Sequence, residues 1–202
     1  MMSKYIIGLT GASGAIYGVR LIKALLERGH QTLITITDAG RRVLREEVGW
    51  NLAGAAWEIE ASLKNYFGID ETSELIRYFD NNDVGALIAS GSVKTDGMII
   101  VPCTMSAVSA IARGASTDLL ERAADVILKE KRTLVVVPRE TPLSQVHLHN
   151  LLMLAQMGVH VMPAMPAFYY KPQSLDDIID FMVGRVLDFL GVEHSLYKRW
   201  QG

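Results

Sequence analysis

Four short apolar runs constrain this sequence more than any other feature. The runs lie at Tyr5–Thr10, Gln31–Thr37, Gly97–Pro102 and Thr133–Pro138. Continuous apolar runs of this kind are typical of strands that are buried on both faces, as in parallel sheets. Between the first two runs, apolar residues recur at helical spacing over Ala15–Glu27. This alternation predicts an α/β fold built on an open parallel sheet with helices on both faces.

The rest of the chain contains further segments with helix or strand character. The helical segments that we expect are Asp38–Val48, part of Trp50–Phe67, Ser106–Arg113, Leu119–Lys129, Leu143–Met157 and Leu175–Leu190. Asp38 or a neighbour is a candidate N-cap for the first of these, and Ser174 for the last. Two short strands are expected at Leu75–Phe79 and Val159–Met162. The sequence shows no internal repeat and no linker, so one domain over residues 1–202 is expected.

The composition excludes several classes of protein. Of the 202 residues, 50% are hydrophobic and 21% are charged, and the formal net charge is -2. Such a chain has enough apolar material for a packed core, which argues against disorder. The slightly acidic balance argues against a nucleic-acid-binding protein. Cys103 is the single cysteine, so no disulfide can form within the chain and a reducing compartment is expected.

The sequence also argues against a membrane or secreted protein. No apolar stretch approaches the roughly 18 residues that a membrane span needs. The segment MMSKYIIGLTGASG reaches glycine after a few apolar residues and lacks the apolar core of a signal peptide. We therefore expect a cytoplasmic protein that binds neither a membrane nor a nucleic acid.

A glycine-rich loop, TGASGAIYG, separates the first expected strand from the first expected helix. Glycine lets the backbone approach an anion closely, and a helix N-terminus offers free N–H groups. The loop could hold a phosphate or a flavin ring edge, or it could be a tight turn without a ligand. Its spacing matches neither GxGxxG nor the Walker pattern. It is closer to the TGxxxGxG turn of short-chain dehydrogenases, and Asp38 could then hold a ribose. Those enzymes need a Tyr-x-x-x-Lys pair, however, and no tyrosine in this sequence is followed by a lysine four residues later.

Charged residues follow the run TLVVVP, and ligands gather at the carboxyl ends of parallel strands. Arg139 could hold a phosphate through two N–H groups, and Glu140 could move a proton; the alternative is a surface turn. Arg122 and Lys129 are seven residues apart and share a helical face, which would otherwise be a solvated basic face. The loop PAMPAFYYKPQS could line an apolar pocket or pack against a neighbouring subunit.

Neither the histidines nor the cysteine indicate a reactive site. His147 and His149 lie two residues apart in an expected helix and point to different faces, and no other spacing supports zinc. Cys103 follows an expected strand and is expected to be a small buried residue rather than a nucleophile. No metal site is therefore predicted.

Three separated segments resemble the UbiX family of flavin prenyltransferases: TGASGAIYGVRL, ERAADVILKEKRTLVVVPRETPLS and MPAFYYKPQSLDDIIDFMVGRVLD. The closing RWQG is also similar to that family, and only about Glu46–Lys94 is weakly matched. The resemblance implies a flavodoxin-like Rossmann variant that forms a homododecamer with active sites at subunit interfaces. It implies that a dimethylallyl group passes from dimethylallyl monophosphate to N5 and C6 of reduced FMN, without a metal. A UbiD-type decarboxylase would receive the prenylated FMN.

The resemblance also implies roles for individual residues. Ser13 would lie near flavin N5 and assist proton handling, and Glu140 would exchange a proton with the phosphate group. The substrate phosphate would be surrounded by Lys129, Tyr169 and Arg185. The residues expected to contact FMN are Gly11, Ala12, Ser13, Thr37, Thr104, Met105, Ser106, Ala107 and Arg139.

Further residues complete the implied site. Arg122 would contact the substrate, Trp200 would add an aromatic wall, and Glu47 would be a catalytic carboxylate, with Glu46 as the alternative. Val84 stands where some members of the family carry tryptophan, so a thinner aromatic lining is expected here.

Two other functions remain open from the sequence. An FMN-dependent peptidyl-cysteine or phosphopantothenoylcysteine decarboxylase would share the fold, but those enzymes usually carry a PASANT-type motif and an early catalytic histidine. Here PCTMSA takes the place of that motif, and His30 is the first histidine. The third possibility is a non-catalytic flavin-binding subunit of a hydroxyarylic-acid decarboxylase, because some relatives are described as decarboxylase subunits.

Overall fold

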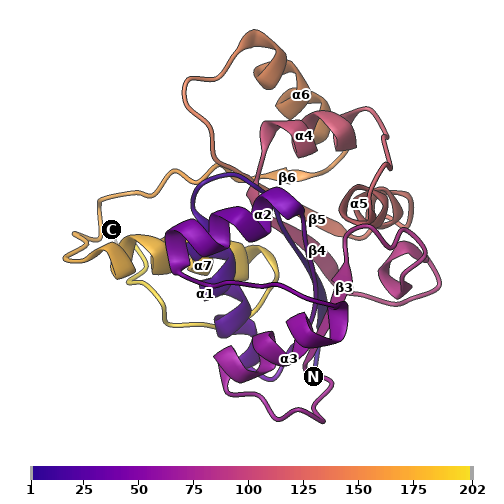
Figure 1. The fold of residues 1–202 in the computed structure, drawn as a ribbon. Helices are drawn as coiled ribbons and strands as arrows, with labels where there is room; N and C mark the ends of the chain where they lie inside the picture. The colour runs from indigo at the N-terminus through magenta and orange to yellow at the C-terminus, as the bar shows by residue number, and fades with distance from the viewer. Residues whose placement is uncertain (1, 201–202) are drawn as a thin grey trace.

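The core of the molecule is a six-stranded parallel sheet with the strand order β3-β2-β1-β4-β5-β6 (Figure 1). The computed structural model describes residues 2–200 of the chain. The strands are β1 (Lys4–Leu9), β2 (Gln31–Ile36), β3 (Ile76–Asp80), β4 (Gly97–Cys103), β5 (Thr133–Pro138) and β6 (His160–Val161). The chain builds outward from β1 to β3 and then returns to place β4 on the other side of β1. Ligands of open α/β sheets bind at such a switch point.

Helices cover both faces of this sheet. They are α1 (Ala15–Leu26), α2 (Asp38–Val43), α3 (Ala56–Phe67), α4 (Met105–Ala112), α5 (Leu119–Lys129), α6 (Gln145–Gln156) and α7 (Leu175–Phe189). α1, α3 and α7 pack into one apolar layer, whereas α4, α5 and α6 pack into the other (Figure 1). Strand side chains alternate between the layers, as Ile99 and Ile100 of β4 do, so this strand is apolar on both faces. Within residues 2–200, no helix has both the length and the apolar composition needed to cross a bilayer.

The predicted α/β fold is confirmed, and the differences are local. The N-cap of α2 is Thr37, whose hydroxyl oxygen accepts the N–H of Gly40 at 3.0 Å. After α2 the helix continues as a π-helical turn over Leu44–Val48, within the range expected for one helix. Ser174 caps α7 as predicted, because its hydroxyl oxygen accepts the N–H of Asp177 at 3.1 Å.

Gly18 allows α1 to lie close to the sheet. A Cβ atom here would be 2.5 Å from the carbonyl oxygen of Val101 in β4. We expect Gly18→Ala to lower the free energy of unfolding by about 1–3 kcal/mol, because overpacking against a strand backbone outweighs the better helix propensity of alanine. Denaturant unfolding at fixed protein concentration measures this change. Gly85→Ala is the control, since its Cβ would be 3.5 Å from Asp83, and an equal effect of both substitutions would contradict the packing argument.

Candidate active site

The loops after β1 and β4 form the carboxyl edge of the sheet at the switch point. Thr10 ties them together, because its buried hydroxyl donates to the carbonyl of Pro102 at 2.8 Å and accepts the N–H of Thr104 at 2.8 Å. Thr104 in turn caps α4 by accepting the N–H of Ala107 at 3.2 Å. α1, α2 and α4 all begin at this edge, so the positive ends of their dipoles point to the same region.

The glycine loop between β1 and α1 is shaped by close backbone packing. A Cβ atom at Gly11 would lie 2.5 Å from the Cβ of Ala39 at the start of α2. Gly14 is the N-cap of α1 and has a φ of 101°, in the left-handed region that favours glycine. Since Gly14 has no side chain to cap α1, the N–H groups at the start of this helix need a partner from elsewhere.

Glu47 supplies that partner from 33 residues farther along the chain. One of its carboxylate oxygens accepts the N–H groups of Gly14 and Ala15 at 2.9 and 3.0 Å. Burial raises the pKa of Glu47, but hydrogen bonds from Ser13 and these two N–H groups, together with the charge of Arg139, outweigh burial and lower it. The start of α1 is therefore already occupied by a carboxylate that is ionised at neutral pH.

We expect Glu47→Gln to lower the free energy of unfolding by about 0.5–2 kcal/mol at neutral pH, as for the loss of other N-terminal helix interactions. The folded-state pKa of Glu47 lies below its unfolded value. The stabilisation is therefore complete above the ordinary carboxyl pKa and is lost as the pH falls through the lowered value. Denaturant unfolding across this pH range should show the two proteins converging in acid.

Glu46→Gln is the matched control for this prediction. Glu46 pairs with Arg42 at 2.8 Å on an exposed surface and does not contact the glycine loop. Of the two candidate carboxylates, Glu47 is the one at the loop. A loss of stability in Glu46→Gln as large as that in Glu47→Gln would contradict the capping role.

Arg139 brings the end of β5 to the same edge. Its Nε donates to the carbonyl oxygen of Ser13 at 3.2 Å, and its backbone N–H donates to the carbonyl oxygen of Cys103 at 3.4 Å. Ser13, Glu47 and Arg139 are far apart in the sequence and meet at the switch point. The structure thus brings together three of the predicted site residues, two from loops and Glu47 from the π-helical turn.

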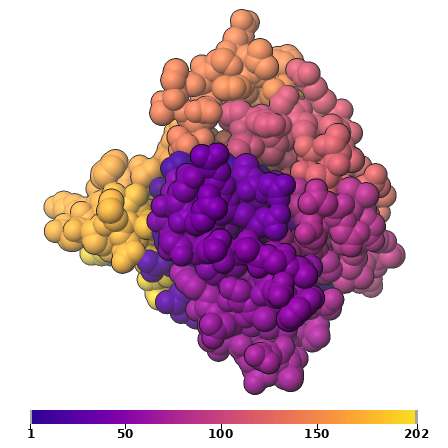
Figure 2. Space-filling view, in the orientation of Figure 1, coloured from indigo at the N-terminus to yellow at the C-terminus, as the bar shows by residue number. Residues whose placement is uncertain are grey.

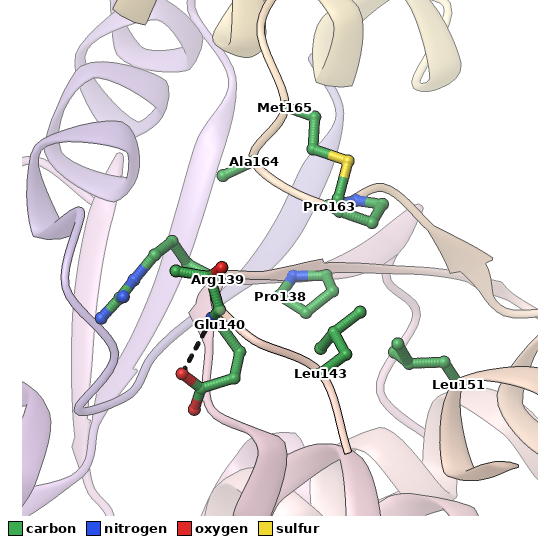
Figure 3. A pocket seen from close by; sticks show the side chains of 9 residues that line it. Pro138, Arg139, Glu140, Leu143, Leu151, Pro163, Ala164 and Met165 are labelled. Atoms are coloured by element: carbon green, nitrogen blue, oxygen red, sulfur yellow. Dashed lines mark hydrogen bonds between the residues drawn. The ribbon is translucent and has the colours of Figure 1, made fainter. Parts of the chain in front are cut away.

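A cavity of about 300 Å³ opens beside Glu140, directly after Arg139. Its apolar wall is formed by Pro138, Leu143, Leu151, Pro163, Ala164 and Met165 (Figure 3). The exposed Glu140 carboxylate accepts the N–H of Thr141 at 3.0 Å. Figure 3 shows the Arg139 guanidinium pointing away from the apolar wall. The arrangement places one carboxylate beside a cavity whose apolar wall suits an apolar group.

Aromatic side chains gather where the loop after β6 meets α7. Tyr169 lies edge-on to Trp200 and Phe181, with ring-centroid distances of 5.5 and 5.9 Å. Arg185 follows Phe181 by one helical turn and pairs with Asp188 at 3.2 Å. Three predicted substrate residues, Tyr169, Arg185 and Trp200, therefore lie in one region of the protomer.

Lys129 and Arg122 lie in a different region. Both are exposed on α5, which covers the opposite face of the sheet from α7 (Figure 1). Lys129 ends α5, and β5 begins shortly afterwards at Thr133, so Lys129 lies near the amino edge of the sheet. Within one protomer, Lys129 therefore lies in a different region from Tyr169 and Arg185.

Most of the predicted site residues are open to solvent in one chain. The exposed ones are Ser13, Glu47, Ser106, Arg122, Lys129, Glu140, Tyr169, Arg185 and Trp200. Val84 is exposed as well. Charges stabilise a transition state strongly only where water is excluded. Water therefore screens the charges of these side chains in a single protomer.

Sequence reasoning did not find Thr10 or Asp188. Thr10 ends an apolar run, and nothing local marks its link between two loops. Asp188 follows Arg185 by three residues, which is the spacing of a helical ion pair and could have indicated their contact. Cys103 is buried as predicted, and burial raises its pKa to about 12, which makes it a poor nucleophile. Among residues 2–200, no group of three or more His, Cys, Asp or Glu side chains is placed to hold a metal ion.

Comparison with known proteins gives agreement in both sequence and structure. The Flavoprotein family model matches residues 2–187. A flavin prenyltransferase UbiX from Halalkalibacterium halodurans is 49% identical over 97% of this chain and 92% of its own length. AnUbiX in complex with FMN and dimethylallyl pyrophosphate has a TM-score of 0.88 and 34% identity, covering 100% of this chain and 99% of its own. A dodecameric FMN-dependent UbiX-like decarboxylase from Escherichia coli O157:H7 has a TM-score of 0.86 and 42% identity, covering 98% of this chain and 100% of its own.

These matches run through nearly the whole sequence and through the whole fold. They include the glycine loop, the end of β5 and most of α7, where several of the predicted site residues lie. The predicted flavodoxin-like fold and the predicted family are both confirmed. The chain belongs to the UbiX family of flavin prenyltransferases.

Proposed function

We propose that this protein joins a dimethylallyl group from dimethylallyl monophosphate to N5 and C6 of reduced FMN, with the whole chain acting as one flavoprotein domain. The observation that carries the proposal is the meeting of Ser13, Glu47 and Arg139 at the switch point, beside the cavity at Glu140. The flavin supplies the nucleophilic atoms. The protein's own residues hold both substrates in line, neutralise the departing phosphate and move protons.

The chemistry of the side chains at the switch point fits a flavin. Hydroxyl and guanidinium donors suit the oxygen and nitrogen acceptors of the ring and are offered by Ser13, Thr37, Thr104, Ser106 and Arg139. Because Glu47 already holds the N–H groups at the start of α1, we place the flavin ring edge there, and not the flavin phosphate. We place the phosphate at the start of α4, over Thr104–Ala107, where a helix N-terminus favours an anion.

Lys129, Tyr169 and Arg185 are proposed to bind the phosphate of the allyl substrate. A monophosphate leaves slowly unless its charge is neutralised while the C–O bond breaks, and two cations with one hydroxyl provide that neutralisation. Arg122 would add a cation from the same helix as Lys129. Glu140 would hold or transfer a proton at a phosphate oxygen.

The allyl group is proposed to lie against the aromatic side chains. Positive charge develops on its carbon atoms as the phosphate leaves, and the faces of Tyr169 and Trp200 attract positive charge. Val84 supplies no ring, so these two residues would carry this interaction without a third aromatic partner.

We propose that two protomers build each site within a homododecamer. α5 and α7 cover opposite faces of the sheet, so Lys129 and Arg122 would come from one protomer and Tyr169 and Arg185 from its neighbour. The dodecameric relative from Escherichia coli supports this assembly. The ligands of AnUbiX, FMN and dimethylallyl pyrophosphate, support the two substrate classes.

Anaerobic incubation with reduced FMN and dimethylallyl monophosphate tests the proposed reaction. Mass spectrometry should detect a flavin that is heavier by one prenyl unit, and the absence of such a product would contradict the proposal. Dimethylallyl diphosphate in a parallel reaction determines which phosphate donor is preferred. Decarboxylation of a cysteinyl substrate by the purified protein would instead support the cysteine-decarboxylase alternative.

We further propose that a UbiD-type decarboxylase in the cytoplasm receives the prenylated FMN. The reaction needs reduced flavin, and a reducing compartment maintains one. Purified product should activate such a decarboxylase that has been prepared without its cofactor. Co-purification with a large decarboxylase at fixed stoichiometry, without turnover by this chain alone, would instead support a non-catalytic subunit.

A further inference from the structure

The C-terminal segment Val192–Trp200 folds back beside α7, where one carboxylate of the helix accepts hydrogen bonds from three of its side chains. Figure 2 shows this part of the chain in yellow at the edge of the molecule. The side chain of Asp188 is 15% exposed and accepts three hydrogen bonds from the segment. The donors are His194 Nε2 at 3.0 Å, the Tyr197 hydroxyl at 2.7 Å and the Arg199 guanidinium at 2.5 Å.

The local packing shows that this attachment is specific. The side chain of His194 is 0% exposed, and its Nδ1 accepts the N–H of Leu196 at 3.2 Å. Nε2 therefore carries the hydrogen that is donated to Asp188. A Cβ atom at Gly184 would lie 2.6 Å from Tyr197 and 2.7 Å from His194, so the segment lies directly against the helix.

Arg185 shares the same carboxylate. Its guanidinium lies 3.2 Å from Asp188, which is the longest of the four contacts. Burial raises the pKa of Asp188, but the hydrogen bonds from the C-terminal segment outweigh burial and lower it, so the carboxylate is ionised at neutral pH. Because three nearer donors engage the carboxylate, Arg185 is oriented by it and keeps further N–H groups for another anion.

The C-terminal segment also carries an aromatic residue to the predicted substrate region. Trp200 meets the ring of Tyr169 at a centroid distance of 5.5 Å and an interplanar angle of 85°. We propose that Asp188 is a positioning residue for the allyl phosphate, because it holds the C-terminal segment on α7 and thereby places Arg185 and Trp200 beside Tyr169. This inference rests on the proposed function and adds to it a residue that need not touch the substrate.

Asp188→Asn tests the proposal through its separate effects on the allyl phosphate and on FMN. We expect KM for dimethylallyl monophosphate to rise by about tenfold or more, since hydrogen bonds to charged groups are worth at least that factor. FMN affinity should change by less than about threefold, because the flavin-binding loops do not contact Asp188, whereas kcat should fall as well, because Arg185 and Trp200 also act while the C–O bond breaks. Asp176→Asn is the matched control on the same helix, where Asp176 pairs with Arg20 and is 70% exposed.

Hydrogen exchange gives a second readout that does not depend on activity. Amide exchange over Val192–Trp200 should become faster in Asp188→Asn, while the middle of α7 stays protected. Tyr197→Phe keeps the ring and removes one hydrogen bond, so it decides the question if Asp188→Asn does not fold. A folded variant with unchanged KM and unchanged exchange would overturn the proposal. Failure of the wild-type protein to transfer a prenyl group would count against the proposed function. Amide hydrogen exchange would still test whether Asp188 attaches the C-terminal segment to α7.

Discussion

When Lys129→Ala chains and Arg185→Ala chains are assembled together, the mixture is expected to recover part of the prenyl transfer that each variant has lost alone. Each substitution removes one cation from the departing phosphate and should slow transfer by about 10²–10³-fold. The two helices that carry these residues cover opposite faces of one protomer. In a random one-to-one assembly, about one quarter of the two-protomer sites would contain both intact side chains. Co-expression with two affinity tags, followed by initial rates of flavin product formation, measures this recovery.

The matched control combines Arg185→Ala with Tyr169→Phe. Both residues lie in the same region of one protomer, so every mixed site would lack one of them. This mixture should be no faster than its separate components. Equal rates in the two mixtures, with neither above the separate variants, would contradict a site built from two protomers.

Glu140→Gln is expected to slow prenyl transfer by about 10²-fold or more, as for the loss of other general acid or base groups. Glu140 stands at the mouth of the apolar cavity, and its carboxylate accepts the N–H of Thr141. Glutamine keeps the size and a hydrogen-bond acceptor but cannot exchange a proton. The rate with saturating substrates measures the effect, and flavin fluorescence measures FMN binding, which should stay unchanged.

Glu27→Gln is the control for this substitution. Glu27 is a similarly exposed glutamate at the end of α1, at the opposite edge of the sheet from the glycine loop. It should leave both rate and affinity unchanged. A Glu140→Gln rate within about twofold of the wild type would remove the proton-transfer role.

The strands could be predicted from sequence because burial on both faces leaves an uninterrupted apolar run. β5 was predicted with its observed bounds for this reason, and β4 to within one residue. The start of α7 could also be predicted, since the cap at Ser174 is a local feature. The role of Glu47 as a cap could not, because nothing near Leu44–Val48 marks a carboxylate that reaches back to the glycine loop.

Contacts that form only after the chain folds back could not be predicted from the sequence either. His194 and Tyr197 meet Asp188 because the C-terminal segment returns along α7. The separation of Lys129 from Arg185 likewise depends on which face of the sheet each helix covers, and that is determined by the crossover connections rather than by a local pattern. The resemblance grouped Lys129 with Arg185 by chemistry, whereas the fold assigns them to separate faces.

The structure of the assembled oligomer with FMN and dimethylallyl monophosphate tests the central claim most directly. The allyl phosphate is expected to lie over the flavin ring edge at Ser13. Its phosphate should be contacted by Lys129 of one protomer and by Tyr169 and Arg185 of a neighbouring one. A phosphate bound with no Lys129 from any protomer within hydrogen-bonding distance would contradict the account.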